Sequence, residues 1–298
     1  MRVNEEAGRI PHEQLGVALA ASRPPAEPSV RIRPNKPWAP VDLGEVWEHR
    51  QLLLLLVLRD LKLRYHQTLL GATWVVLQPL MMTLVLAAFL GLMARPQTDG
   101  IPYPLFLYAG LLPWTFFSNA VLGASYSLVT NADLVSKIYF PRLILPAAAV
   151  GVRLADFVIA FVALLAMMLY YGVRPPAAGA LLWPLVVLNL VLLAAALGAL
   201  FASLHIRYRD VGTVLPVLLQ LWMFASPILY PSGLVPEKWR WAYYLNPLAG
   251  GVENFRAALF GLPINRGALL ASAGVTAALV IYTSFSFRRM EDEFADSI

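Results

Sequence analysis

Three basic side chains recur at helical spacing within the stretch RDLKLRYHQTLLGATWVVLQP, which covers residues 59–79. Arg59, Lys62 and His66 are three and four positions apart, so one helix presents all three on the same face. The opposite side of that helix carries the apolar residues Leu54, Leu58, Leu61 and Tyr65. The pattern predicts a basic amphipathic helix that lies on a membrane surface, followed from Gly71 by a segment that enters the membrane.

A second charged pair, Arg153 and Asp156, falls inside a long apolar stretch at residues 144–171. One helix brings residues three positions apart to the same face. Because ionisable groups are costly within a membrane, we expect the pair to be buried against partners or to lie near the cytoplasmic end of an overlong helix. Local neutralisation favours a structural pair, and a role with a substrate or a proton stays open.

The sequence contains none of the common catalytic patterns. It has no cysteine, no GxxxxGK[ST] loop that would cradle ATP phosphates, no HExxH and no GxSxG. Its histidines show no metal-ligand spacing; they are His12, His49, His66 and His205. We therefore expect no catalytic residue, no metal site and no cofactor bound by this chain. Because Asp156 is the only carboxylate within a predicted span and no internal repeat is visible, an ion gradient is disfavoured as an energy source.

The composition indicates that lipid is the solvent for most of the chain. Of its 298 residues 59% are hydrophobic and 14% are charged, with a mean hydropathy of +0.63. Soluble domains carry about 25% charged residues. Spanning segments must be helices or a closed barrel, and long apolar runs without alternation favour helices. The net charge of +5 is read as a mark of the cytoplasmic side rather than of nucleic-acid binding.

The apolar runs predict an all-α polytopic membrane protein with six transmembrane helices. The first four spans are expected at 72–93, within 101–132, at 144–171 and at 181–204, and the last two at 214–230 and 267–287. Between the last two, residues 237–244 read as an interfacial aromatic belt and residues 248–259 as an amphipathic helix that dips into the outer leaflet. Most Lys and Arg residues lie before the first span, in the loops 131–142 and 205–212, or after the last span, which favours cytoplasmic N- and C-termini.

Four regions follow from this pattern. We expect a disordered, proline-rich cytoplasmic arm, an amphipathic interface helix, a six-span domain and an acidic cytoplasmic tail, at residues 1–41, 42–70, 71–289 and 290–298. The arm has no apolar run long enough for a signal peptide.

Five blocks, in order, carry a family resemblance. They are RDLKLRYHQTLLGATWVVLQPL, PYPLFLYAGLLPWTFFSNAV, LVSKIYFPRLILP, HIRYRDV together with residues 224–231, and LNPLAGGVENFRAALFG. Together these blocks resemble the permease of type-two ATP-binding-cassette exporters for polysaccharides and lipid-linked O antigens. The resemblance covers about residues 43–289.

The resemblance implies a homodimer of six-span permeases that sits on two copies of a separate nucleotide-binding ATPase, which holds ATP and Mg. It also implies a coupling helix at residues 131–142 that docks into the ATPase, and re-entrant helices between spans five and six. The residues expected to couple to the ATPase are Leu134, Lys137, Ile138, Tyr139, Phe140, Arg142, Arg207 and Arg209. Leu134, Ile138 and Phe140 would insert into an apolar cleft; the alternative is a loop that is only positive on the inside.

In the resemblance, the first and fifth spans line a lateral route for the lipid-linked substrate. Aromatic side chains suit the apolar faces of sugar rings, which makes Trp114, Phe117, Trp222, Phe224 and Tyr230 candidates for the translocation path. Such residues are also common as interfacial anchors. Arg59, Lys62 and Arg64 would attract a diphosphate-linked carrier, or hold the helix to anionic lipid at about 1 kcal/mol each.

These patterns favour a subunit of the bacterial inner membrane that exports lipid-linked polysaccharide with ATP hydrolysed on a partner. Its expected partners are the ATPase, a second copy of the chain, the lipid-linked polysaccharide and membrane lipid, with no nucleic acid. Two alternatives stay open: a permease for teichoic acid, and a membrane enzyme that acts on a lipid-linked glycan carrier. The enzyme would need polar catalytic side chains at one membrane depth, where only Arg153 and Asp156 are found.

Overall fold

A computed structural model describes residues 43–66, 71–93, 98, 100–177 and 179–291. The chain divides into two units, residues 1–36 and 37–298. The predicted arm at 1–41 lies outside the described residues, as do 67–70 of the interface segment and 292–298 of the tail. In the part that is described, every regular element is a helix.

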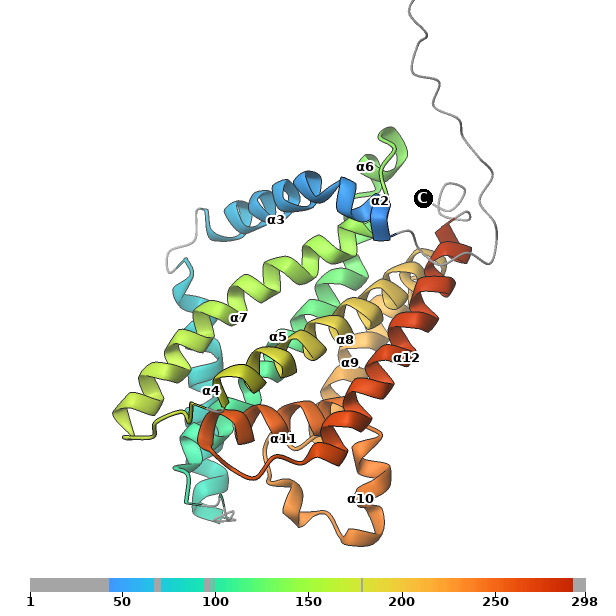
Figure 1. Cartoon of the computed structure of the whole chain (residues 1–298). Helices are drawn as coiled ribbons and strands as arrows, with labels where there is room; N and C mark the ends of the chain where they lie inside the picture. The colour runs from blue at the N-terminus through green and yellow to red at the C-terminus, as the bar shows by residue number, and fades with distance from the viewer. Residues whose placement is uncertain (1–42, 67–70, 94–97, 99, 178, 292–298) are drawn as a thin grey trace, which may run out of the picture. The chain divides into compact units, whose positions relative to one another are not determined.

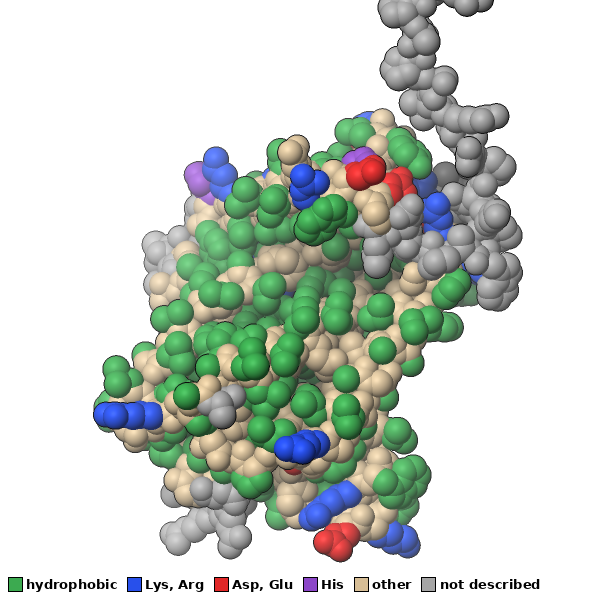
Figure 2. All heavy atoms as spheres, viewed as in Figure 1, with side chains coloured by type: hydrophobic (Ala, Val, Ile, Leu, Met, Phe, Trp, Pro, Cys, Tyr) green, Lys and Arg blue, Asp and Glu red, His purple; other side chains and the backbone are tan. Residues whose placement is uncertain are grey.

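Among the described residues, five helices are long and apolar enough to cross a membrane. They are α4 (Thr73–Met93), α5 (Tyr103–Thr130), α7 (Ile144–Tyr170), α8 (Gly179–Arg207) and α12 (Arg266–Glu291) (Figure 1). Their bounds follow the predicted first, second, third, fourth and sixth spans closely. On the face drawn in Figure 2, charged side chains gather towards the two ends, with hydrophobic side chains between them.

Helix α5 is the centre of the bundle and packs against α4, α7 and α8. Its core side chains include Leu105, Leu107 and Phe117, each with no exposed surface. A Cβ atom at Gly198 of α8 would lie 2.6 Å from the Cβ of Ala124 in α5, so this glycine permits the close approach of the two helices. By contrast α4, the first span, is mostly exposed.

The predicted fifth span is shorter than expected. Helix α9 (Val211–Phe224) has 14 residues, which corresponds to about 21 Å of helix, against about 30 Å for the apolar layer of a bilayer. Residues 225–230 continue as turns and bends. Pro227 disfavours helical backbone at this point, and side chains of the outer segment, Asn246 and Arg256, donate to the carbonyl oxygens of Ala225, Pro227 and Ile228, so local sequence and tertiary contacts agree in ending this helix.

The interface segment forms α2 (Leu43–Glu48) and α3 (Arg50–Tyr65), and α3 packs along α7. Leu56 is buried in this contact, and a Cβ atom at Gly151 of α7 would lie 3.0 Å from Val57. The apolar face predicted from periodicity is only partly correct. Leu61 and Tyr65 face the protein, whereas Leu54 and Leu58 are 58% and 64% exposed.

Between α9 and α12 the chain forms η1 (Ser232–Leu234), α10 (Glu237–Tyr244) and α11 (Pro247–Phe260). Helix α11 is almost completely buried and packs against α8, α12 and α5. It starts at Asn246, whose side chain accepts a hydrogen bond from Leu248 N at 3.1 Å, and ends at Gly261 with a φ of 72°, a conformation that favours glycine. At the other end of the bundle α6 (Ala132–Lys137) follows α5, and Arg142 donates to the carbonyl oxygen of Glu291 in α12.

Candidate functional site

Helix α3 carries an open basic pocket on its outward face. Arg59, Lys62, Leu63 and His66 line it, with a volume of about 300 Å³. The three basic residues predicted to share one helical face, Arg59, Lys62 and His66, therefore line the same pocket. Arg59 donates to Asp60 at 2.8 Å and to the side-chain oxygen of Asn131 at 3.1 Å. Because Asn131 stands between α5 and α6, this bond joins the pocket to the start of the predicted coupling segment.

Arg64 lies on a different face of α3, apart from this pocket, and pairs with the third span. Its Nη1 lies 2.9 Å from Oδ2 of Asp156, and Nη1 of Arg153 lies 3.4 Å from the same oxygen. The hydroxyl of Tyr65 donates to Oδ1 of Asp156. In the structure Arg153 and Asp156 form an ion pair, and this pair is part of a cluster of four residues with Arg64 and Tyr65.

Burial and the hydrogen bond to Asp156 raise the pKa of Tyr65 to about 12, so its hydroxyl remains a proton donor at neutral pH. The carboxylate of Asp156 accepts from both arginines and from this hydroxyl, whereas the two guanidinium groups bring two positive charges to one negative charge. The side chains of Arg64 and Arg153 are 37% and 25% exposed, which leaves part of each guanidinium group accessible.

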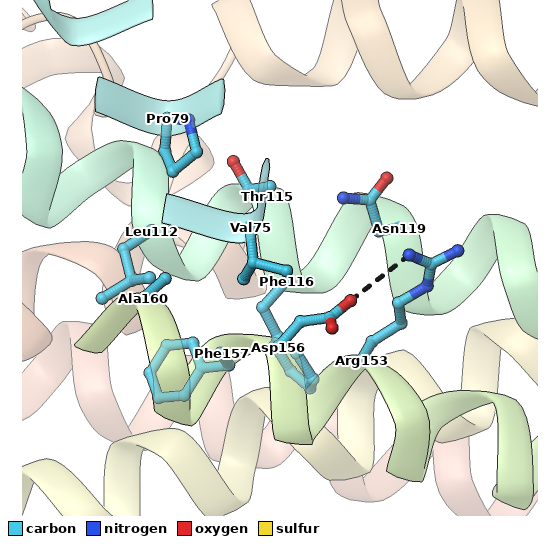
Figure 3. Close-up of a pocket in the computed structure, with 10 residues that line it drawn as sticks. All are labelled: Val75, Pro79, Leu112, Thr115, Phe116, Asn119, Arg153, Asp156, Phe157 and Ala160. Carbon is cyan, nitrogen blue, oxygen red and sulfur yellow. Dashed lines mark hydrogen bonds and ion pairs between the residues drawn. The ribbon is translucent and has the colours of Figure 1, made fainter. Parts of the chain in front are cut away.

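Figure 3 shows this carboxylate at the edge of a small cavity of about 30 Å³ between α4, α5 and α7. Val75 and Pro79 come from α4, and Thr115 and Asn119 from α5, beside the Arg153 and Asp156 pair of α7. The cavity has room for about one water molecule. It gives the cluster polar neighbours within an otherwise apolar bundle.

Two larger pockets continue from the cluster along α4. One of about 210 Å³ is lined by Arg64, Tyr65, Gly71, Trp74, Val75 and Gln78. The other, about 760 Å³, shares Trp74 and Gln78 with it and also takes in Ser118 and Asn119 of α5. The two pockets share the side chains of Trp74 and Gln78, so they adjoin each other along α4, and together we call them the groove; its lining runs from the end of α3 to α4 and α5.

The aromatic residues predicted for a translocation path lie in different environments. Trp114 lines the larger pocket, whereas Phe117 has no exposed surface and stacks edge-on against Trp222 at 5.4 Å. The indole N–H of Trp222 donates to Asn246 at 2.9 Å. Phe224 is 56% exposed, and Tyr230 donates to the carbonyl oxygen of Phe224 at 3.1 Å. Of the five residues, only Trp114 borders the groove described above.

The predicted coupling residues are divided between surface and core. Ile138 is 56% exposed and Tyr139 is 89% exposed. Phe140 is buried in a core cluster of this chain, and Leu134 is packed against that cluster. The proposed insertion of Phe140 into a cleft on another protein is therefore corrected, because its ring is already covered by α7 and its neighbours.

The remaining coupling residues are polar and lie near the same end. Lys137 pairs with Asp133 at 3.3 Å along α6. Arg207 and Arg209 are exposed where α8 ends, and the Arg207 guanidinium group stacks on Tyr208 at 5.6 Å. The contact between Arg142 and α12 fixes the turn that follows α6.

Sequence reasoning missed Arg256, the most deeply buried cation among the described residues. Its guanidinium group donates to the carbonyl oxygens of Phe106, Pro227 and Ile228 at 3.1, 2.5 and 2.7 Å. The signal was present, because Arg256 is four positions after Val252 and so lies on the apolar face predicted for this helix. An arginine on such a face indicates a specific buried partner.

The fold and this groove define a class of protein: a polytopic helical membrane protein with a basic helix beside its first span. Among the described residues no cluster could hold a metal ion. The family model described as "ABC-2 type transporter" matches residues 51–260, and the chain belongs to this family. The resemblance found in the sequence blocks is thereby confirmed.

Individual relatives extend over most of the chain. An O-antigen export system permease protein RfbA of Myxococcus xanthus is 33% identical over 85% of this chain and 98% of its own length. A protein of the same name from Klebsiella pneumoniae is 30% identical over 69% of this chain and 78% of its own. A polysialic acid transport protein KpsM of Escherichia coli is 26% identical over 80% and 92%.

Proposed function

We propose that the chain is the transmembrane permease subunit of an ATP-driven exporter. Its substrate is a lipid-linked polysaccharide of the O-antigen type, moved outward across the bacterial inner membrane. The names of two relatives at 30% identity or more support this substrate class. The observation that carries the route is the groove that begins at Arg64 and Tyr65 of α3 and continues along α4 and α5.

The groove fits an amphipathic substrate that enters from the side. The headgroup of the carrier rests at the cations of α3, while its lipid tail stays in the membrane against exposed apolar residues. Trp74, Met81 and Val85 line the groove and belong to the exposed face of α4. Many weak contacts along such a face suit a polymer that must slide better than one deep pocket would.

The energy source in this proposal is a separate ATPase subunit, present in two copies, which binds ATP and Mg. Ile138 and Tyr139 supply the apolar contact with it, because they are the large exposed side chains beside α6. Lys137, Arg207 and Arg209 add positive charge at the same end of the bundle. This chain itself binds no cofactor and catalyses no reaction.

The assembly in this proposal is a homodimer with six spans in each copy. Helix α9 serves as the fifth span together with residues 225–230, and α10 and α11 form the outer re-entrant segment. Both termini are cytoplasmic, because the basic ends of α3 and α12 lie at the end that carries α6. The exposed apolar faces of α4 and α9 are assigned to lipid and to the second copy.

Purification with the ATPase tests the proposal. We expect the full chain, coexpressed with the ATPase encoded by a neighbouring reading frame, to copurify with it and to export lipid-linked polysaccharide only when ATP is hydrolysed. Tyr139→Ala should weaken the association, whereas Tyr282→Ala, at another exposed tyrosine that lies on α12, should not. Absence of an ATPase from the purified protein, or export without ATP, would contradict the proposal.

A further inference from the structure

We propose that Arg64 and Arg153 form a binding site for the diphosphate group of a lipid, and that the carboxylate of Asp156 holds this site until the ligand takes its place. The inference rests on the proposed function, because it concerns the headgroup of the same lipid-linked substrate. It adds Arg153 as a ligand residue and Asp156 as an internal competitor.

The geometry is that of an anion site. Two guanidinium groups from different helices converge on one oxygen, Oδ2 of Asp156, at 2.9 and 3.4 Å. The planar guanidinium group has several donors in a fixed arrangement that matches carboxylate and phosphate oxygens alike. The hydroxyl of Tyr65 supplies a further donor to the other carboxylate oxygen. A phosphate oxygen at the position of Oδ2 would meet the same donors.

The charges favour a diphosphate over the carboxylate. Asp156 provides one negative charge for the two positive charges of Arg64 and Arg153. A diphosphate ester carries more than one negative charge and therefore neutralises both guanidinium groups. An electrically neutral headgroup has no comparable attraction to this cluster. The hydroxyl of Tyr65 is neutral at neutral pH and adds no charge to this cluster.

The space around the cluster determines from which side the ligand arrives. Beyond Asp156, between α4, α5 and α7, the cavity of about 30 Å³ is too small for a diphosphate. On the side of Arg64 and Tyr65 the pocket measures about 210 Å³ and joins the groove through Trp74 and Gln78. A headgroup therefore enters past the end of α3, while its lipid tail follows the groove.

Ligand binding then has a structural consequence for α3. In this structure Asp156 holds the end of α3 to α7 through both Arg64 and Tyr65. A diphosphate that takes over Arg64 and Arg153 breaks the direct pair between Arg64 and Asp156 and itself bridges α3 and α7, so the ligand replaces the carboxylate as the link between the two arginines. Asp156 thus competes with the ligand for the two arginines, which are the binding residues.

The test measures binding to the full chain in complex with its ATPase, in nanodiscs of neutral phosphatidylcholine. Labelled farnesyl diphosphate is the probe, and farnesol, inorganic diphosphate and phosphatidylglycerol serve as competitors. We expect Arg64→Gln and Arg153→Gln each to weaken binding of the probe about tenfold or more, through loss of a charge-assisted hydrogen bond. The matched control is Arg174→Gln, an exposed arginine after the opposite end of α7, which should bind as the native complex does.

Asp156→Asn separates competition from simple support. If the carboxylate competes with the ligand, its removal strengthens binding of farnesyl diphosphate. If Asp156 only holds Arg64 in place, its removal weakens binding as Arg64→Gln does, and the inference is overturned. Should Asp156→Asn fail to fold, Arg153→Gln decides, since it leaves the pair of Arg64 and Asp156 intact; native affinity in that variant also overturns the inference.

The competitors identify the source of the phosphate groups. Weak competition by farnesol, inorganic diphosphate and phosphatidylglycerol supports a lipid diphosphate, whereas equal competition by any of them overturns it. The proposed function is judged separately, by ATP-dependent export of polysaccharide in the same complex. If the native protein exports polysaccharide but Arg153→Gln binds farnesyl diphosphate with native affinity, this inference is wrong and the proposed exporter function still holds.

Discussion

The contact of Arg256 with α5 and the turn after α9 permits a quantitative prediction, because it can also be disturbed by a substitution at the neighbouring Gly110. The guanidinium group of Arg256 is 3% exposed, stacks on the Phe106 ring at 3.6 Å, and donates to three carbonyl oxygens from two segments. Arg256→Lys keeps the charge, but a single ammonium nitrogen cannot replace the three guanidinium nitrogens that donate to α5 and to the turn after α9. Loss of two charge-assisted hydrogen bonds at about 1.5–3 kcal/mol each predicts destabilisation of about 3–6 kcal/mol.

Gly110→Ala perturbs this contact from α5. A Cβ atom at Gly110 would lie 2.0 Å from Nη2 of Arg256 and 2.7 Å from the carbonyl oxygen of Ile228, so the guanidinium group and the turn after α9 must move. The matched control is Gly123→Ala on the same helix, where the nearest atom is 3.7 Å away. Alanine is favoured over glycine in a helix by about 1 kcal/mol, so Gly123→Ala should be neutral or stabilising.

The measurement is the free energy of unfolding of the purified protein in mixed micelles, for both single variants and for the double variant. Because Gly110→Ala and Arg256→Lys disturb one contact, the double variant should be less destabilised than the sum of the two. ATP hydrolysis by the complex should survive in Arg256→Lys, since α6 lies at the other end of the bundle (Figure 1). Strict additivity, or a Gly110→Ala variant as stable as Gly123→Ala, would refute the reasoning.

Three further predictions concern other parts of the groove and the coupling end. The double variant Arg59→Glu with Lys62→Glu reverses the charge of the basic pocket, and we expect it to reduce export. Membrane insertion and dimerisation, measured on the same variant, should not change. Unchanged export would mean that this face of α3 serves only as a membrane anchor. Phe140→Ala should destabilise the chain by about 3–5 kcal/mol, because the ring of Phe140 is buried, whereas Ile138→Ala should change stability little, because Ile138 is exposed. Equal effects of the two substitutions in unfolding experiments would contradict the buried position of Phe140. Trp222→Phe removes the donor to Asn246 and should cost about 1 kcal/mol of stability with export retained; loss of export at native stability would restore Trp222 as a path residue.

The long spans could be predicted because each is a local, uninterrupted apolar run. The structure has α4 at Thr73–Met93 where residues 72–93 were expected, and α7 at Ile144–Tyr170 where 144–171 were expected. The fifth span could not be predicted in the same way. Its helix ends at Phe224, three residues before Pro227, and the turn that follows is held by Arg256 and Asn246, whose partners at residues 225–228 are distant in sequence and cannot be read from a local pattern.

The site was predictable only as far as helical spacing reaches. Periodicity placed Arg59, Lys62 and His66 on one face, and the structure gathers them in one pocket. It gave no means of separating Arg64 from them, because the partner of Arg64 is Asp156, on another helix. Charge spacing paired Arg153 with Asp156 correctly, but the contact with α3 that turns this pair into a cluster depends on how two distant helices pack.

The bond between Arg59 and Asn131 brings the coupling end and the basic pocket into one set of contacts. The Asn131 side chain accepts from Arg59 at 3.1 Å and donates to the carbonyl oxygen of Ser127 at 2.8 Å, at the corner between α5 and α6. A displacement of α6 that moves this corner therefore moves or breaks the contact with Arg59, which lines the pocket. In the proposed exporter, this path joins the surface offered to the ATPase, Ile138 and Tyr139, to the basic pocket of α3 without passing through the apolar core.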